Sequence, residues 1–166
     1  TLLAFLLLIG CSTYDPKYRE GEPTKNFNYP TEKKIEKSFY LLGDAGYSPP
    51  GGSSEGLIAF KNYMDSVKVT DNYTIILGDN IYPVGMPPKD SPKREAAEYR
   101  LDAQLDAIEK YKGKVVVIPG NHEWYNEGIG GLERERDYLK EKLKDNLIWA
   151  PKTGCGLDVI EISENI

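Results

Sequence analysis

Histidine and cysteine are scarce in this sequence: 166 residues contain one histidine, His122, and two cysteines, Cys11 and Cys155. Two cysteines exclude a disulfide framework and the paired spacing of a zinc ribbon. Cys155 is expected either to pair with a cysteine beyond the last residue shown or to be a buried thiol. A basic surface is also lacking, because the formal net charge is -5 and the lysines and arginines are scattered among acids. We therefore expect no nucleic-acid partner.

Long apolar runs are absent too, since the longest, residues 2–9, is too short to span a bilayer as a helix. It fits the apolar region of an export signal, and we expect the true start of the chain to precede Thr1. The run continues into Leu8-Ile9-Gly10-Cys11, which resembles a bacterial lipobox, so Cys11 is the predicted lipidation site. The protein is then an exported lipoprotein of a bacterial cell envelope, held at a membrane surface by lipid. An ordinary signal peptide with a chance cysteine is the alternative.

The rest of the chain predicts a linker and one domain. Residues 1–11 are the signal remnant, residues 12–36 are a polar linker, and residues 37–166 are the folded part. Short apolar runs closed by glycine predict strands at 38–43, 73–78 and 114–120, and further strands are expected at 147–149 and 157–162. Helical patterns cover 53–67, with Ser53 or Ser54 as N-cap, 91–111, with Ser91 as cap and Pro92 in the first turn, and 132–143. This alternation predicts an α/β fold with at least a partly parallel sheet.

Three of the predicted strands end in residue types that are able to bind metals. The strand tips read Gly43-Asp44-Ala45-Gly46, then Gly78-Asp79-Asn80-Ile81-Tyr82, then Gly120-Asn121-His122-Glu123. One Gly-Asp after a strand is as consistent with a simple turn as with a site. Three tips at the same sheet edge, supplying carboxylate, carboxylate with phenol, and amide with imidazole, indicate a metal centre with mixed oxygen and nitrogen ligands.

Tyr82 narrows the choice of metal. A phenol with a pKa of about 10 ionises poorly at neutral pH, so its use as a ligand implies a strongly Lewis-acidic cation such as ferric iron. A carboxylate has two oxygens, so one aspartate is able to bridge two ions roughly 3.5 to 4 Å apart.

These blocks resemble the first three motifs of the purple acid phosphatases, a branch of the calcineurin-like metallophosphoesterase superfamily. Asp44 with Gly46, Gly78-Asp79 with Tyr82, and Gly120-Asn121-His122-Glu123 carry the resemblance, which extends from Ser38 to the end of the chain. Gly46 stands where many superfamily members have histidine, and this change together with Tyr82 favours the purple branch. The resemblance implies a four-layer αββα sandwich, of which this chain holds the first half.

The resemblance also implies a role for each residue. Asp44 and Tyr82 bind the first metal, Asp79 bridges both, and Asn121 binds the second, in a dinuclear centre of Fe(III) with Fe(II), Zn(II) or Mn(II). The two cations would activate water for attack on a phosphate ester, with His122 as the catalytic residue that binds phosphate or protonates the departing alkoxide. Glu123 is expected to be exposed or capping rather than to orient His122, and Asn80 is expected to be a turn residue.

The match stops short of two histidine blocks that supply three further imidazole ligands in the family. We expect the chain to be a fragment, and with four protein ligands for two ions it should bind metal weakly. One sheet alone would also leave apolar residues uncovered, with Leu41, Ile76, Val116 and Ile118 as candidates.

Three functions are therefore weighed. The first is a membrane-anchored phosphoric ester hydrolase, with phosphomonoesters favoured as substrates. The second is a degenerate, non-catalytic lipoprotein domain of the same fold that binds or scaffolds. The third, a phosphate-binding glycine-rich module at residues 49–56, is disfavoured because that stretch lacks the Gly-Lys-Ser/Thr of a P-loop. Specificity is expected to reside in residues 84–91 and 124–131, and Trp124 and Tyr125 are candidates to line a substrate pocket.

Overall fold

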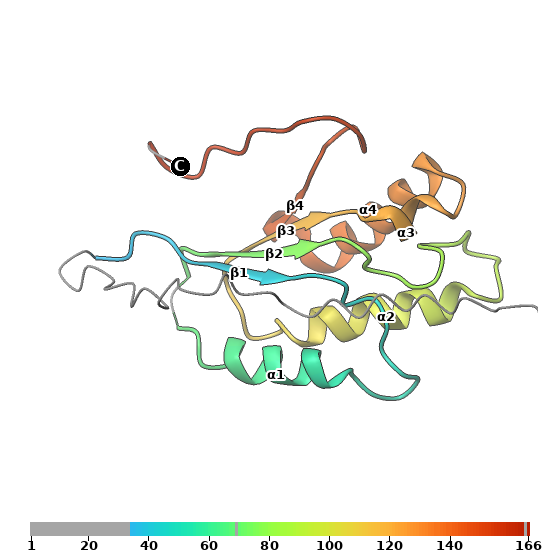
Figure 1. Cartoon of the computed structure of the whole chain (residues 1–166), viewed down its shortest axis with the longest axis horizontal. Coiled ribbons are helices and arrows are strands. Elements are labelled where there is room, and N and C mark those ends of the chain that lie inside the picture. Colours follow the sequence, from blue (N-terminus) through green and yellow to red (C-terminus); the bar gives the residue numbers. More distant parts are fainter. Residues whose placement is uncertain (1–33, 69, 165) are drawn as a thin grey trace, which may run out of the picture. The chain divides into compact units, whose positions relative to one another are not determined.

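The structure, a computed structural model, describes residues 34–68, 70–164 and 166 (Figure 1). The signal remnant, Cys11 and residues 12–33 of the expected linker lie outside the described residues, so their predicted roles are not examined by it. Residues 35–166 form one unit by their internal contacts. No helix in the described part of the chain has the length and apolar character needed to cross a membrane.

Four parallel strands form one sheet in the order β1-β2-β3-β4. The strands are β1 (Phe39–Leu42), β2 (Tyr73–Leu77), β3 (Lys114–Ile118) and β4 (Leu147–Trp149). The register aligns Leu41 with Ile75, Ile75 with Val116, and Val116 with Ile148. The predicted α/β fold with a parallel sheet is confirmed.

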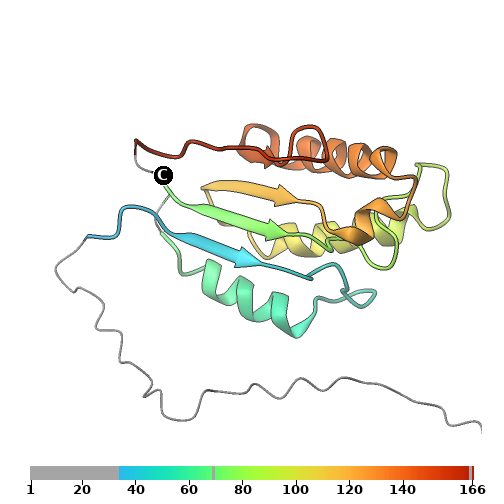
Figure 2. The ribbon, with the colours of Figure 1, turned by 45° about the horizontal axis from the view of Figure 1, so that its top comes forward.

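The longer helices lie on one face of this sheet (Figures 1 and 2). The helical segments are α1 (Glu55–Met64), α2 (Arg94–Asp106), α3 (Asn121–Trp124), α4 (Ile129–Leu143) and the 3₁₀ helix η1 (Lys144–Asn146). Parallel strand-helix-strand connections are right-handed. Because each strand is added on the same side of the previous one, α1, α2 and α4 must cover the same face.

Strand residues alternate between the face that the helices cover and a second face that is partly exposed. Ile76, Val115, Val117 and Trp149 pack into a core with residues of the helices. On the other face Phe39, Leu41 and Leu77 are 39%, 59% and 47% exposed. Leu41, Val116 and Ile118 lie on this second face, and Leu41 is exposed as expected, but Val116 is buried there. Ile76 does not lie on this face, because strand alternation places it against the helices.

The first residues of the helices differ in part from the sequence prediction. Ser54 is the N-cap of α1, and its Oγ accepts the N–H of Leu57 at 3.3 Å. Ser91 does not cap α2, which begins at Arg94. Its Oγ instead accepts the N–H of Lys93 at 3.3 Å and its carbonyl accepts the N–H of Arg94, so Ser91 and Pro92 form a turn before the helix.

One expectation for the C-terminal segment is wrong, and one of the two alternatives for Cys155 is excluded. Residues 157–162 form no strand, because their alternating apolar side chains meet no neighbouring strand within the described residues: Leu157 is 99% and Val159 is 90% exposed. Cys155 is exposed, so it is not a buried thiol.

Candidate metal centre at the strand tips

The tips of β1 and β2 are joined by backbone hydrogen bonds. The N–H of Asp44 donates to the Gly78 carbonyl at 3.2 Å, that of Gly46 to the Asp79 carbonyl at 3.0 Å, and that of Tyr82 to the Gly46 carbonyl at 3.1 Å. Asp44 and Asp79 both have positive φ, at 54° and 52°. Such conformations cost about 1 to 3 kcal/mol outside glycine and persist where the surroundings enforce them, often at functional sites.

Tyr82 lies between the two aspartates. Its hydroxyl is 2.9 Å from Asp44 Oδ1 and 3.0 Å from Asp79 Oδ2. The hydrogen bond to Asp44, then burial, then the hydrogen bond to Asp79 raise the pKa of the Tyr82 phenol well above its ordinary value. No lysine or arginine of the described residues forms a salt bridge with either aspartate.

This arrangement fits a hard cation. Two carboxylates face one phenol oxygen that carries a single proton, and an ion bound there would neutralise the accumulated negative charge. The set is nevertheless small: among the described residues, no three His, Cys, Asp or Glu side chains gather in a way that could hold a metal. The residues therefore fit part of a metal centre.

Gly46 explains why no histidine follows Asp44. A Cβ atom at Gly46 would lie 2.4 Å from the Asn80 carbonyl carbon, 2.5 Å from the Asp79 oxygen and 2.5 Å from the Ile81 nitrogen. These are backbone atoms, which cannot rotate away. The two loops approach too closely for any side chain at this position.

Gly46→Ala is expected to destabilise the fold by about 1 to 3 kcal/mol, the usual cost of overpacking, because the loops must separate. Gly56→Ala is the control, since a Cβ there meets nothing within 4 Å. Urea unfolding of both variants measures the difference. Equal stability of the two would show that the β1 and β2 tips are not packed as described.

The third tip begins the short helix α3. Asn121 donates its amide nitrogen to the Tyr125 hydroxyl at 2.7 Å, and within the described residues no hydrogen bond joins its side chain to Asp44, Asp79 or Tyr82. The remaining amide oxygen is the atom suited to a cation. The backbone N–H of His122 donates to Asp79 Oδ1 at 3.3 Å, which brings the third tip to the second.

His122 lies against Tyr82, with ring centroids 4.3 Å apart. Its Nδ1 is 2.6 Å from the Pro83 carbonyl oxygen. Because a carbonyl only accepts, Nδ1 must carry a hydrogen, and Nε2 is the nitrogen left to contact a ligand. The ring is thus oriented by the loop after β2.

The Glu123 side chain joins the tips of β2 and β3 by hydrogen bonds. It is fully buried, and its carboxylate accepts the N–H of Asp79 at 3.0 Å, of Gly120 at 2.6 Å and of Ile81 at 2.9 Å. Burial raises the pKa of Glu123, and the hydrogen bonds from Ile81 and Gly120 oppose this. The expected capping role is present through Gly120, whereas the expected exposure is wrong: the carboxylate satisfies donors of two strand tips.

A buried polar network behind the site was not predicted. Asn80 is fully buried and donates its amide nitrogen to Glu135 Oε1 of α4 at 2.9 Å and to the Ile118 carbonyl at 3.2 Å. Gln104 of α2 donates to the Asn80 carbonyl at 2.7 Å. Asn80 therefore does more than form a turn, because it ties the β2 tip to two helices. The sequence signal was an acid, Glu135, three residues after Leu132 and four before Leu139 on the apolar face of α4.

Glu135 should make stability depend on pH. Burial, then the nearby Glu123 charge, raise its pKa well above 4.5. The neutral acid is thus favoured in the fold, and this contribution is complete below about pH 4.5 and is lost as pH rises toward the folded pKa. Glu135→Gln is expected to flatten the fall in free energy of unfolding between about pH 5 and pH 7. Chemical unfolding checks this against exposed Glu133→Gln, and an equally steep fall in Glu135→Gln would contradict it.

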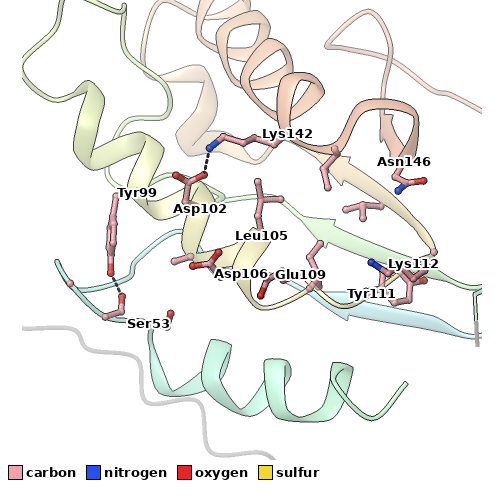
Figure 3. A pocket seen from close by; sticks show the side chains of 17 residues that line it. Ser53, Tyr99, Asp102, Leu105, Asp106, Glu109, Tyr111, Lys112, Lys142 and Asn146 are labelled. Carbon is pink, nitrogen blue, oxygen red and sulfur yellow. Dashed lines mark hydrogen bonds and ion pairs between the residues drawn. The ribbon is translucent and has the colours of Figure 1, made fainter. Parts of the chain in front are cut away.

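A cavity of about 850 Å³ lies elsewhere and does not contain these residues (Figure 3). It runs along α2, where Tyr99, Asp102 and Asp106 line it, and reaches Lys112 before β3. Acids and lysines are mixed there, and Asp102 forms an ion pair with Lys142 at 3.2 Å. The cavity is thus separate from the predicted metal site.

The family model described as calcineurin-like phosphoesterase matches residues 37–161 of this chain. The chain belongs to this family, and its parallel sheet with helices is consistent with part of a metallophosphoesterase. The family is one of metal-dependent phosphoester hydrolases, which generally hold a dinuclear metal centre. A search of curated proteins found no match.

Proposed function

We propose that this chain carries part of the active site of a phosphoric ester hydrolase of the purple acid phosphatase type. The observation that carries the proposal is the contact of Tyr82 with both Asp44 and Asp79. A tyrosine in place of a histidine ligand suits ferric iron, and the close approach of backbone at Gly46 fits the same exchange.

In this proposal each strand tip contributes to a dinuclear centre. Asp44 and Tyr82 bind the first metal, Asp79 bridges, and the Asn121 amide oxygen binds the second, in a pair of Fe(III) with Fe(II), Zn(II) or Mn(II). When bound, such a pair supplies Lewis acidity that neutralises phosphoryl oxygens and makes hydroxide available near neutral pH. These assignments extend the family membership to particular residues.

His122 is the proposed catalytic residue. With Nδ1–H held by the Pro83 carbonyl, Nε2 is left to face the substrate, and in the imidazolium form it would donate a hydrogen bond to the phosphate or a proton to the departing alkoxide. The burial of Glu123 under the tips supports this role indirectly, because it fixes the backbone from which His122 and Asp79 project.

The second candidate is a non-catalytic binding or scaffold domain of the same fold. The small ligand set of the described residues favours it, since hard cations need six or more donors and water would have to supply most of them. In either case we propose that the protein is exported and anchored to a membrane by lipid on Cys11. We propose a phosphate ester as its ligand and expect no nucleic-acid partner.

A visible spectrum tests the enzyme proposal. Ferric iron added to the chain is expected to give a phenolate charge-transfer band, and Tyr82→Phe is expected to lose it while Tyr125→Phe keeps it. Phosphate release from a phosphomonoester, measured with iron and zinc or manganese at about 1 mM, is expected to be low but dependent on metal. A band retained in Tyr82→Phe would overturn the ligand assignment.

A further inference from the structure

A hollow of about 400 Å³ opens beside the candidate metal centre. It lies between the loop after β2 and the residues after α3, which are the two segments expected from the sequence to set specificity. Its lining residues are Val84, Pro87, Pro88, Ser91, Pro92, Lys93, Tyr125 and Asn126. The volume falls within the range of small-molecule sites, roughly 300 to 1,000 Å³.

Two contacts place this hollow next to His122. Tyr125 lines it, and the Tyr125 ring lies 5.0 Å from the His122 ring while its hydroxyl accepts from Asn121. On the opposite wall, Val84 directly follows Pro83, whose carbonyl holds His122 Nδ1. A molecule with its phosphate at the strand tips would therefore have its organic group within reach of the hollow.

The hollow is preformed, because arginines hold both of its walls. Arg134 of α4 donates to the Met86 carbonyl at 3.0 Å in one loop and to the Asn126 carbonyl at 3.0 Å in the other. Arg94 donates to the Pro87 carbonyl at 2.8 Å. Three prolines further restrict the backbone, so little ordering is needed when a ligand enters.

The lining is mainly apolar and suits a flat ring. Val84 and the prolines present carbon surface, and Tyr125, 60% exposed, presents an aromatic ring. Ser91, Lys93 and Asn126 supply a few polar groups, as is typical of ligand sites. Burial of this carbon surface favours a ligand that brings an apolar group into the hollow.

We propose that this hollow receives the organic group of a phosphate monoester and that this group is an apolar ring, as in aryl or arylalkyl phosphates. The inference rests on the proposed function, since that function places the phosphate at the strand tips. It adds the substrate class and assigns Val84 and Tyr125 to recognition of the group that leaves.

The first test compares 2-phenylethyl phosphate with ethyl phosphate, whose leaving alcohols are alike at the reacting oxygen. The metal-loaded chain is expected to favour the phenylethyl ester in kcat/KM by about tenfold or more, the effect of burying a ring. Val84→Glu should reduce this ratio to about one, because a carboxylate in the hollow opposes an apolar ring. Ile58→Glu, an exposed apolar-to-acid change on α1, should keep the ratio.

The second test needs neither metal nor catalysis. Addition of 2-phenylethanol to the chain should shift the NMR signals of the Val84 methyl groups and the Tyr125 ring, and ethanol should not. A ratio near one in the unmodified chain, or no shift with 2-phenylethanol, would overturn the inference. If neither ester is hydrolysed with metal, the proposed function fails, and the NMR result still decides the nature of the hollow.

Discussion

Asp79→Asn is expected to weaken metal binding by at least about 100-fold. Loss of a residue that only supports a metal ligand costs about 10 to 100-fold in affinity, so loss of a charged, bridging ligand should cost more. Asparagine keeps the size of the side chain and an oxygen that accepts the His122 N–H, which Asp79 Oδ1 accepts at 3.3 Å. The change therefore removes mainly the charge that faces Tyr82.

The affinity for ferric iron or Mn(II) is measured by calorimetric titration of the metal into each variant. Asp90→Asn is the matched control, since Asp90 is an exposed aspartate in the same loop after β2. It should leave the affinity unchanged. Equal affinities of the two variants would place any bound metal away from the strand tips and would remove the basis for the proposed roles of Asp44, Tyr82 and Asn121 as well.

The sheet could be predicted because its signal is local. Each strand is a short apolar run ended by a turn residue, and the helices between them fix the parallel direction. The same reasoning predicted that Asp44, Asp79 and Tyr82 lie close together, since the carboxyl ends of parallel strands share one edge of the sheet. The structure brings these three side chains into contact, and their roles as metal ligands stay predictions.

Features that depend on tertiary packing could not be predicted in the same way. Helix α3 has four residues, too few for a helical period, and its cap comes from Glu123 rather than from a side chain at Gly120. The 157–162 segment has the alternation of a strand, but alternation produces a strand only when a neighbour supplies hydrogen bonds. Whether Asn121 turns its amide to Tyr125 is a choice of rotamer that sequence spacing does not determine.

The buried polar residues form an intermediate case. Glu135 lies on the apolar face of α4, and Gln104 lies three residues after Leu101 on the buried face of α2. An acid or amide at a core position is costly unless it is hydrogen-bonded, so the pattern itself predicts an interaction. Its partner, Asn80, could be identified only in three dimensions. The β2 tip thus gains its rigidity from two helices as well as from its neighbouring strands.

Glu123→Ala is expected to cost about 3 kcal/mol or more in free energy of unfolding and to weaken metal binding by about 10 to 100-fold. The Glu123 carboxylate accepts the backbone N–H groups of Asp79, Ile81 and Gly120, and each buried donor left without a partner costs about 1 to 3 kcal/mol. Asp79 would no longer be fixed, so affinity should fall although no ligand is removed. Urea unfolding and metal titration measure the two effects.

Two further variants separate the hydrogen bonds from the general effect of changing a glutamate. Glu123→Gln keeps one acceptor oxygen for the Asp79 and Gly120 N–H groups but places an amide N–H₂ opposite the Ile81 N–H. Its free energy of unfolding should therefore lie between those of wild type and Glu123→Ala. Exposed Glu133→Ala on α4 should change stability by less than about 0.5 kcal/mol. If Glu123→Ala were as stable as Glu133→Ala, the three N–H groups would have other acceptors, and the strand tips would be held together by backbone hydrogen bonds alone.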